Sequence, residues 1–170
     1  MAFITDTSGI VSFAEYDDVF AQDKRVFDSN EGLTDEVIES ALMRATERLL
    51  NKFRSTEWWR TYWLKRSSDT SSVRTVADIP QLDPSRIKAR QSDFTELCVA
   101  FALAEYILPQ VADFGGEDDN EWNKMGHYSK RANEMFAELV NVGDWYDFDD
   151  DGEILSVEKQ PGNYTLKRVR

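Results

Sequence analysis

The stretch DFTELCVAFALAEYILPQ, residues 93–110, decides the fold of this 170-residue chain. Its apolar residues recur at helical spacing, and Val99 to Leu103 is apolar on almost every side. That pattern predicts a central helix that is buried all round. Upstream, Asp83 followed by Pro84 is a typical helix start, with an acidic N-cap and proline in the first turn. We therefore expect this helix to begin at Asp83 and to end or kink at Pro109.

Two amphipathic helices are predicted to cover the central one. LTDEVIESALMRATERLLNKF, residues 33–53, has Thr34 as an N-cap followed by two acids, and predicts a helix from Asp35 to about Arg54. DDNEWNKMGHYSKRANEMFAELV, residues 118–140, predicts a helix that ends near Gly143. Apolar stripes need partners. The contacts expected between the three helices join Leu97, Phe101 and Leu108 to Leu42, Leu49, Met135 and Leu139.

The remaining segments complete a mainly α fold: an antiparallel helical bundle with a small β-hairpin and extended terminal arms. A first helix is expected from Ser12 to Val26, with Ser12 as its N-cap. Residues 67–72 read as a polar loop, and 73–82 as a short strand or an extended arm. Three regions follow from this: an N-terminal arm and helix (1–32), a bundle core with a polar loop near 67–82 (33–143), and an acidic hairpin with a basic C-terminal arm (144–170).

Composition and charge exclude several classes of protein. The net charge of −12 argues against an ordinary nucleic-acid binder, which shows a basic face. There is no uninterrupted run of eighteen apolar residues, so we expect no membrane span, and the N-terminus does not resemble a secretory signal. The single cysteine, Cys98, is expected to be a buried core residue. Because it cannot form a disulfide within the chain, we expect the protein to be made in a reducing compartment. Basic residues concentrate between Lys52 and Arg90, so copies could pair block against block, or the charges could simply be solvated.

No catalytic constellation accompanies the reactive residue types. His127 is the only histidine and lacks a nucleophile elbow, a phosphate loop or zinc-ligand spacing around it. Gly115-Gly116 alone is too little to be a phosphate loop. We therefore expect a protein that is not an enzyme, with no catalytic, cofactor-binding or metal-binding residues and no cofactor. The aromatic cluster Trp58 to Trp63 is interpreted as a core-capping or subunit-contact feature, in preference to a base-stacking surface.

The acidic stretch from Asp147 to Glu158 admits two interpretations. Asp147, Asp149, Asp151, Gly152 and Glu158 fall at the ligand and turn positions of a twelve-residue EF-hand calcium loop. However, Pro-Gly at 161–162 leaves little room for an exiting helix, and no second loop is present. The preferred interpretation is a hairpin in which 145–148 pairs with 153–159 around an Asp-Gly turn, with the turn carboxylates in solvent.

The order of these elements resembles that of the head–tail connector (adaptor, or head completion) proteins of tailed bacteriophages. The resemblance rests on the three helical stretches 33–53, 93–110 and 118–140 and on WYDFDDDGEIL, residues 145–155. It implies a structural virion protein, made in the host cytoplasm and placed at the head–tail interface. Such a protein forms a homo-oligomeric, twelvefold ring between the portal and the next neck or tail completion protein. DNA passes through its lumen without specific binding, and no membrane is involved.

Two further expectations accompany this resemblance. The basic tail 161–170 is interpreted as an assembly arm that docks on an acidic neighbour, although a frayed terminus is the alternative. The alternative function from another class is a calcium-binding regulatory module that uses the loop 147–158.

Overall fold

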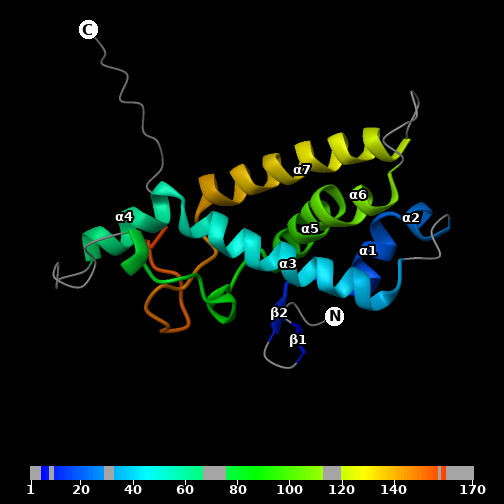
Figure 1. Ribbon diagram of the computed structural model, residues 1–170. Coiled ribbons are helices and arrows are strands. Elements are labelled where there is room, and N and C mark those ends of the chain that lie inside the picture. The colour runs from blue at the N-terminus through cyan, green and yellow to red at the C-terminus, as the bar shows by residue number, and fades with distance from the viewer. Residues whose placement is uncertain are drawn as a thin grey trace, which may run out of the picture.

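The computed structural model describes residues 5–7, 10–28, 33–66, 76–112, 120–156 and 158–159, and in these the chain is mainly helical, as predicted (Figure 1). The predicted polar loop at 67–72 and the basic arm at 161–170 lie outside the described residues. The elements, in chain order, are β1 (Thr5–Thr7), β2 (Ile10–Ser12), α1 (Tyr16–Gln22), α2 (Arg25–Asp28), α3 (Asp35–Arg54), α4 (Glu57–Arg66), the 3₁₀ turns η1 (Val76–Asp78) and η2 (Pro84–Arg86), α5 (Gln91–Ala102), the π-helical turn η3 (Leu103–Ile107), α6 (Leu108–Val111) and α7 (Asn120–Val142).

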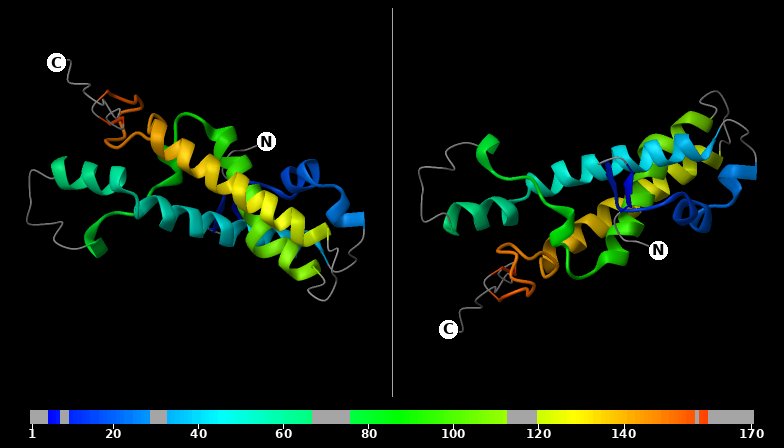
Figure 2. Two further views of the ribbon diagram at one scale, coloured as in Figure 1. Left: turned by 90° about the horizontal axis from the view of Figure 1, so that it is seen from above. Right: turned by 90° about the horizontal axis from the view of Figure 1, so that it is seen from below.

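The core forms where α5 packs against both α3 and α7. Figure 1 shows α5 running in the opposite sense to these two longer helices, and Figure 2 shows them crossing it from either side. The bounds of α3 agree with the prediction, and its whole apolar stripe from Ile38 to Phe53 is buried. Gly143 ends α7 as predicted, with φ of 52° and its N–H bonded to the Leu139 carbonyl at 3.1 Å.

Two of the residues expected in the contacts between the three helices, Phe101 and Met135, are only partly buried. Leu97 and Leu108 are fully buried, whereas Phe101 lies near Tyr106, with the Lys52 ammonium 5.9 Å from its ring. On α7, Trp122 is 58% exposed. Tyr128 is the aromatic residue that α7 buries instead.

The N-terminal segment does not form the predicted helix from Ser12 to Val26. β1 and β2 pair antiparallel, with Thr5 opposite Ser12, so the small hairpin lies at this end of the chain. Phe13 then runs into the core, where its N–H donates to Thr46 Oγ1 at 3.1 Å. Helix α1 starts only at Tyr16, because Glu15 and Asp18 form a capping box. Burial of Phe13 in an extended segment has therefore overridden the local helical pattern.

The central helix is shorter at its start than predicted. Asp83 does cap a turn, accepting a bond from the Ser85 N–H at 2.9 Å, but that turn is the three-residue η2. The chain then extends so that Ile87 forms an antiparallel bridge with Tyr146. α5 begins only at Gln91, after Arg90 adopts a left-handed conformation with φ of 57°. Residues 79–83 form a bend followed by irregular chain, and no strand forms in the described part of 73–82.

Pro109 does not end the helix, which continues to Val111. The α-helical geometry is interrupted just before it by the wider π turn η3, so the predicted irregularity at this proline takes the form of a π turn. The continuous segment Gln91–Val111 is long and apolar enough, by length and composition alone, to cross a membrane, which counting uninterrupted apolar residues did not reveal. In the structure α5 is a core helix packed between α3 and α7, so this is weak evidence for a span.

The unequal burial of two α5 residues gives a direct stability test. We expect Leu97→Ala to lower the free energy of unfolding by about 2–5 kcal/mol, because Leu97 is fully buried. Phe101→Ala should cost only about 1–2 kcal/mol, less than the usual loss for a buried phenylalanine, because Phe101 keeps part of its surface in water. Urea denaturation of both variants measures the difference. A larger loss for Phe101→Ala would contradict this packing.

Candidate functional site

The acidic stretch from 145 to 159 is a closed loop rather than the predicted hairpin. Neither of the two expected strands forms in 144–156 or at 158–159. Tyr146 instead bridges to Ile87, and the Asp147 N–H donates to the Arg86 carbonyl at 3.1 Å. The pairing partner of this segment is therefore the chain just before α5, and the hairpin prediction was wrong.

Two buried carboxylates hold this loop closed. Asp147 has no exposed surface, and its two oxygens accept the N–H groups of Asp150 at 2.7 Å and Gly152 at 2.9 Å. Glu158 is 1% exposed, and its two oxygens accept the N–H groups of Phe148 at 2.9 Å and Leu155 at 2.7 Å. Carboxylates placed in this way accept hydrogen bonds from backbone N–H groups that would otherwise have no acceptor within the loop.

The same loop brings three aspartates together. Ligand oxygens of Asp147, Asp149 and Asp151 lie within 4.8 Å of one another, and the latter two residues are exposed. In an EF-hand the last glutamate turns both oxygens toward the cation. Here both Glu158 oxygens are taken by the backbone, so the loop is held without using that residue as a ligand. The prediction that the turn carboxylates face solvent holds for Asp149, Asp150 and Asp151, whereas Asp147, which precedes the turn, is buried.

The aromatic cluster packs against this loop. Trp59 has no exposed surface, Trp58 is 6% exposed, and the Tyr62 and Phe148 rings stack with centroids 3.6 Å apart. The Trp59 Nε1–H donates to the Pro80 carbonyl at 2.9 Å, and the Trp58 Nε1–H donates to the Glu158 carbonyl at 3.3 Å. The two tryptophans are therefore core residues, as the core-capping interpretation predicted, and they join α4 to the acidic loop.

The residue types considered for catalysis are dispersed. Cys98 is fully buried, and burial raises the pKa of its thiol to about 12, so it is not a nucleophile at neutral pH. His127 is exposed on α7, beside the Tyr128 ring. Gly115-Gly116 lies outside the described residues. Among the residues that the structure describes, no nucleophile, base and acid come together.

A polar anchor joins the N-terminal helices to α7, although no motif in the sequence indicates it. Asp23, 9% exposed, accepts bonds from Lys124 Nζ, 2.9 Å from its Oδ2, and from the Tyr128 hydroxyl at 3.3 Å. Burial, followed by the neighbouring Asp23 charge, raises the pKa of Tyr128 to about 12. The residues lie about a hundred positions apart, so no local pattern could have indicated this contact.

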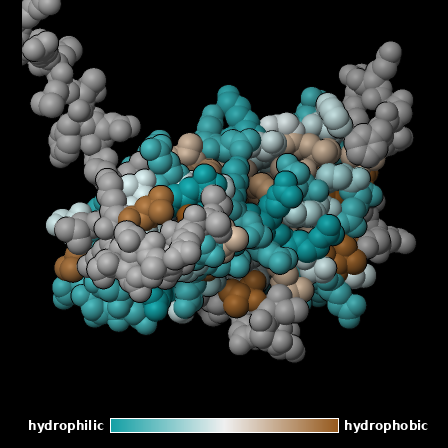
Figure 3. All heavy atoms as spheres, turned by 60° about the vertical axis from the view of Figure 1, so that its left-hand side comes forward, coloured by the Kyte–Doolittle hydropathy of each residue, from teal (hydrophilic) through white to brown (hydrophobic). Residues whose placement is uncertain are grey.

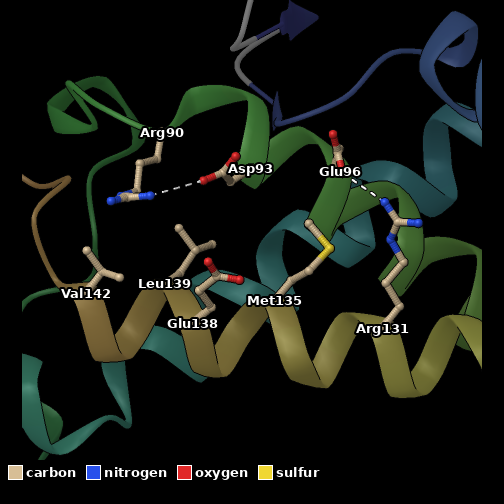
Figure 4. Close-up of a pocket in the computed structure, with 8 residues that line it drawn as sticks. All are labelled: Arg90, Asp93, Glu96, Arg131, Met135, Glu138, Leu139 and Val142. Atoms are coloured by element: carbon tan, nitrogen blue, oxygen red, sulfur yellow. Dashed lines mark hydrogen bonds and ion pairs between the residues drawn. The ribbon is translucent and has the colours of Figure 1, made fainter.

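A shallow groove runs between α5 and α7 (Figure 4). It encloses about 240 Å³, and its lining combines an apolar part from α7 with charged groups from both helices. Arg131 Nη2 lies 3.0 Å from Glu96 Oε2, and Arg90 reaches Asp93 at 3.7 Å. The residues that line it are Arg90, Asp93, Glu96, Arg131, Met135, Glu138, Leu139 and Val142.

One end of this groove is fixed by a bidentate ion pair. Arg90 Nε lies 2.6 Å from Asp144 Oδ1, and its Nη2 lies 3.2 Å from Asp144 Oδ2. Hydrogen bonding to Arg90 holds the pKa of Asp144 below its usual range, and the same bond raises the pKa of Arg90. The backbone of Arg90 is left-handed, and its side chain reaches Asp144, the residue after Gly143.

This pair predicts a specific acid dependence of stability. The pKa of Asp144 is lower in the folded state than the value of 3.8 in the unfolded chain. The stabilisation of the fold by this carboxylate is therefore complete above pH 3.8 and is lost as the pH falls through the lower pKa of the folded state. Both side chains are about a third exposed, so we expect Asp144→Asn to cost only about 1 kcal/mol at pH 7. Urea titrations at pH 7 and pH 3 measure this, and the difference between variant and wild type should shrink at pH 3. An unchanged difference would mean that the ion pair does not stabilise the fold.

Comparison with known proteins yields no relative. No family model matches the chain, and no curated protein and no solved structure is significantly similar to it. The chain's function must therefore be argued from its own residues and their geometry.

Proposed function

We propose that this chain is a structural subunit of a phage head–tail connector. In this proposal copies of the chain form a twelvefold ring that binds the portal on one side and the next neck or tail completion protein on the other. The ring extends the DNA channel in the virion and has no enzymatic activity. Its fold in this reading is an antiparallel helical bundle with extended terminal arms.

The observation that carries the proposal is the packing of the elements on which the resemblance rests. The stretches 33–53, 93–110 and 118–140 correspond to α3, to α5 through α6, and to α7, and these pack into one core. The fourth stretch, 145–155, follows α7 directly and closes onto α4. Its shape differs from the expected hairpin, but its place at the end of the helical body is retained.

The charge of the chain supports a passive DNA channel. With a net charge of −12, the body repels the phosphate backbone, so DNA could slide past without being held. Exposed acids such as Asp149, Asp151 and Glu153 gather in one loop at the end of the body. A specific nucleic-acid interface would instead need a basic surface.

Self-association is the first test of this proposal. Sedimentation velocity over a range of concentrations measures the mass of the purified chain, which is 19.6 kDa for one copy. We expect closed oligomers at high concentration or on addition of portal rings. A chain that stays monomeric under both conditions would contradict the proposal.

A calcium-binding regulatory module remains the second candidate, because Asp147, Asp149 and Asp151 bring carboxylate oxygens within 4.8 Å of one another. Titration calorimetry with Ca²⁺, paired with circular dichroism, separates the two functions. Micromolar affinity accompanied by a change in helix content favours the calcium module. Absence of heat at millimolar Ca²⁺ favours the connector.

A further inference from the structure

The groove between α5 and α7 has the chemistry of a site for a peptide segment. Met135 and Val142 are partly buried and, with Leu139, give the groove an apolar part within reach of solvent (Figure 4). Its volume of about 240 Å³ is below the 300–1,000 Å³ typical of small-molecule pockets. Such a space suits one or two side chains of a docked chain better than a cofactor.

The charged residues of the groove leave a carboxylate for an incoming cation. Arg90 and Arg131 are each already held by carboxylates, through Asp144 and Glu96. Glu138, exposed on α7, is near enough to Arg90 for its charge to help raise the pKa of Arg90, but among the described residues no ion pair holds it. A basic segment lying in the groove would therefore find an acidic partner without displacing an existing pair.

The C-terminal sequence QPGNYTLKRVR, residues 160–170, has the complementary pattern. It contains three apolar side chains (Tyr164, Leu166 and Val169), three basic ones, and no acidic side chain. It continues from Lys159, whose charge helps to hold the pKa of Asp144 low, and Asp144 binds Arg90 at one end of the groove. Lys159, the last described residue before the segment, thus lies near the groove whose polarity and charge match the sequence of the segment.

We propose that residues 160–170 of one copy dock in the α5–α7 groove of a neighbouring copy, placing apolar side chains against Met135 and Val142 and a basic one beside Glu138. This inference rests on the proposed connector function, since it requires copies to adjoin. The contact joins two different surfaces, so it is heterologous, and repeated about an axis it closes into a ring.

The length of the segment allows it to bridge two copies. Eleven extended residues reach roughly 36 Å. The groove follows α7 from Arg131 to Val142, which corresponds to roughly 17 Å of helix. About half the segment therefore remains to cross between copies. The proposal commits to the neighbouring copy, which the remaining length can reach, and docking within one chain is the outcome that the cross-linking below separates from it.

Cross-linking between single-cysteine chains tests this contact. Full-length Asp93→Cys and Thr165→Cys chains are mixed and treated with a short bismaleimide, so that any link between the two positions must join different copies. Asp93 lines the groove and Thr165 belongs to the segment, and neither supplies a contact that the proposal names. The native Cys98 is buried and does not compete. The matched control replaces Asp93→Cys by Ser92→Cys, since Ser92 is exposed on α5 but does not line the groove. A double variant, Asp93→Cys with Thr165→Cys, reports links within one chain.

We expect a linked dimer of the Asp93→Cys and Thr165→Cys chains, strong loss of that product with Ser92→Cys, and ladders of linked chains from the double variant. Equal linking at both α5 positions, or linking only within a chain, would overturn the inference. Sedimentation of the same samples separates the two proposals. Closed oligomers without preferential linking leave the connector function standing and remove this contact, whereas a monomer under all conditions removes both.

Discussion

Trp59→Ala is expected to lower the free energy of unfolding by about 3–5 kcal/mol, which makes it one of the most damaging single substitutions in the chain. Trp59 has no exposed surface, and its ring lies 4.9 Å from Tyr146 and 5.0 Å from Phe148, measured between centroids. Truncation would open a cavity where α4 meets the acidic loop and would leave the Pro80 carbonyl without its indole donor. Urea denaturation followed by tryptophan fluorescence or circular dichroism measures the loss.

The control for this substitution lies on the same helix. Leu64 is 56% exposed on α4, so Leu64→Ala should change the stability of the isolated chain by no more than about 0.5 kcal/mol. A Trp59→Ala variant as stable as Leu64→Ala would mean that α4 does not pack on the acidic loop.

The second large effect is expected at Asp147. Asp147→Ala removes two charge-assisted hydrogen bonds, in which the buried carboxylate accepts the N–H groups of Asp150 and Gly152, and this should cost about 2–4 kcal/mol. The loop would open and expose Phe148 and the face of Trp58 against which it packs. Hydrogen exchange at the Asp150 and Gly152 amides should accelerate in the variant, and thermal unfolding should shift downward.

Glu153→Ala is the matched control, because Glu153 is an exposed acid of the same loop whose removal leaves the backbone bonds of Asp147 intact.

Wild-type protein should keep its unfolding midpoint in EDTA, since backbone donors already satisfy Asp147 and Glu158. If the unfolding midpoint of the wild-type protein drops sharply in EDTA, while Glu153→Ala leaves that midpoint unchanged, a cation holds the loop, and this result would favour the calcium module.

Local signals explain the elements that the sequence predicted well. The bounds of α3 follow from two acids in its first turn and a continuous apolar stripe, although the Thr34 side chain makes no capping bond. Gly143 ends α7 because a left-handed residue is needed there. In both cases the determinants lie within a few residues of the boundary, so periodicity and capping rules are sufficient.

Contacts between distant segments explain the errors. Residues 145–158 have a hairpin-like pattern, but Tyr146 pairs with Ile87, some sixty positions earlier. Glu158 closes the loop through the Phe148 N–H, a bond that alternation of apolar and polar residues does not encode. Phe13 likewise belongs to an extended segment because Thr46, on α3, accepts its N–H. In each case a contact with a distant segment outweighed the local sequence preference for a hairpin or a helix.

The same distinction applies to the candidate sites. The acidic residues of the loop were evident from their spacing, whereas the anchoring role of Asp147 and Glu158 required their burial and backbone partners. The α5–α7 groove could not be predicted, since Arg90 and Arg131 meet their carboxylates only after the helices have packed.

Mass photometry of portal rings mixed with this chain tests the connector function most directly. The portal should be the one encoded in the same genome as the chain, and rings alone provide the baseline. We expect each portal ring to gain a mass near twelve times the 19.6 kDa of one chain, with few partly loaded rings because neighbouring copies stabilise one another. Portal rings whose mass is unchanged by an excess of folded chain would contradict the proposal that this protein is a head–tail connector.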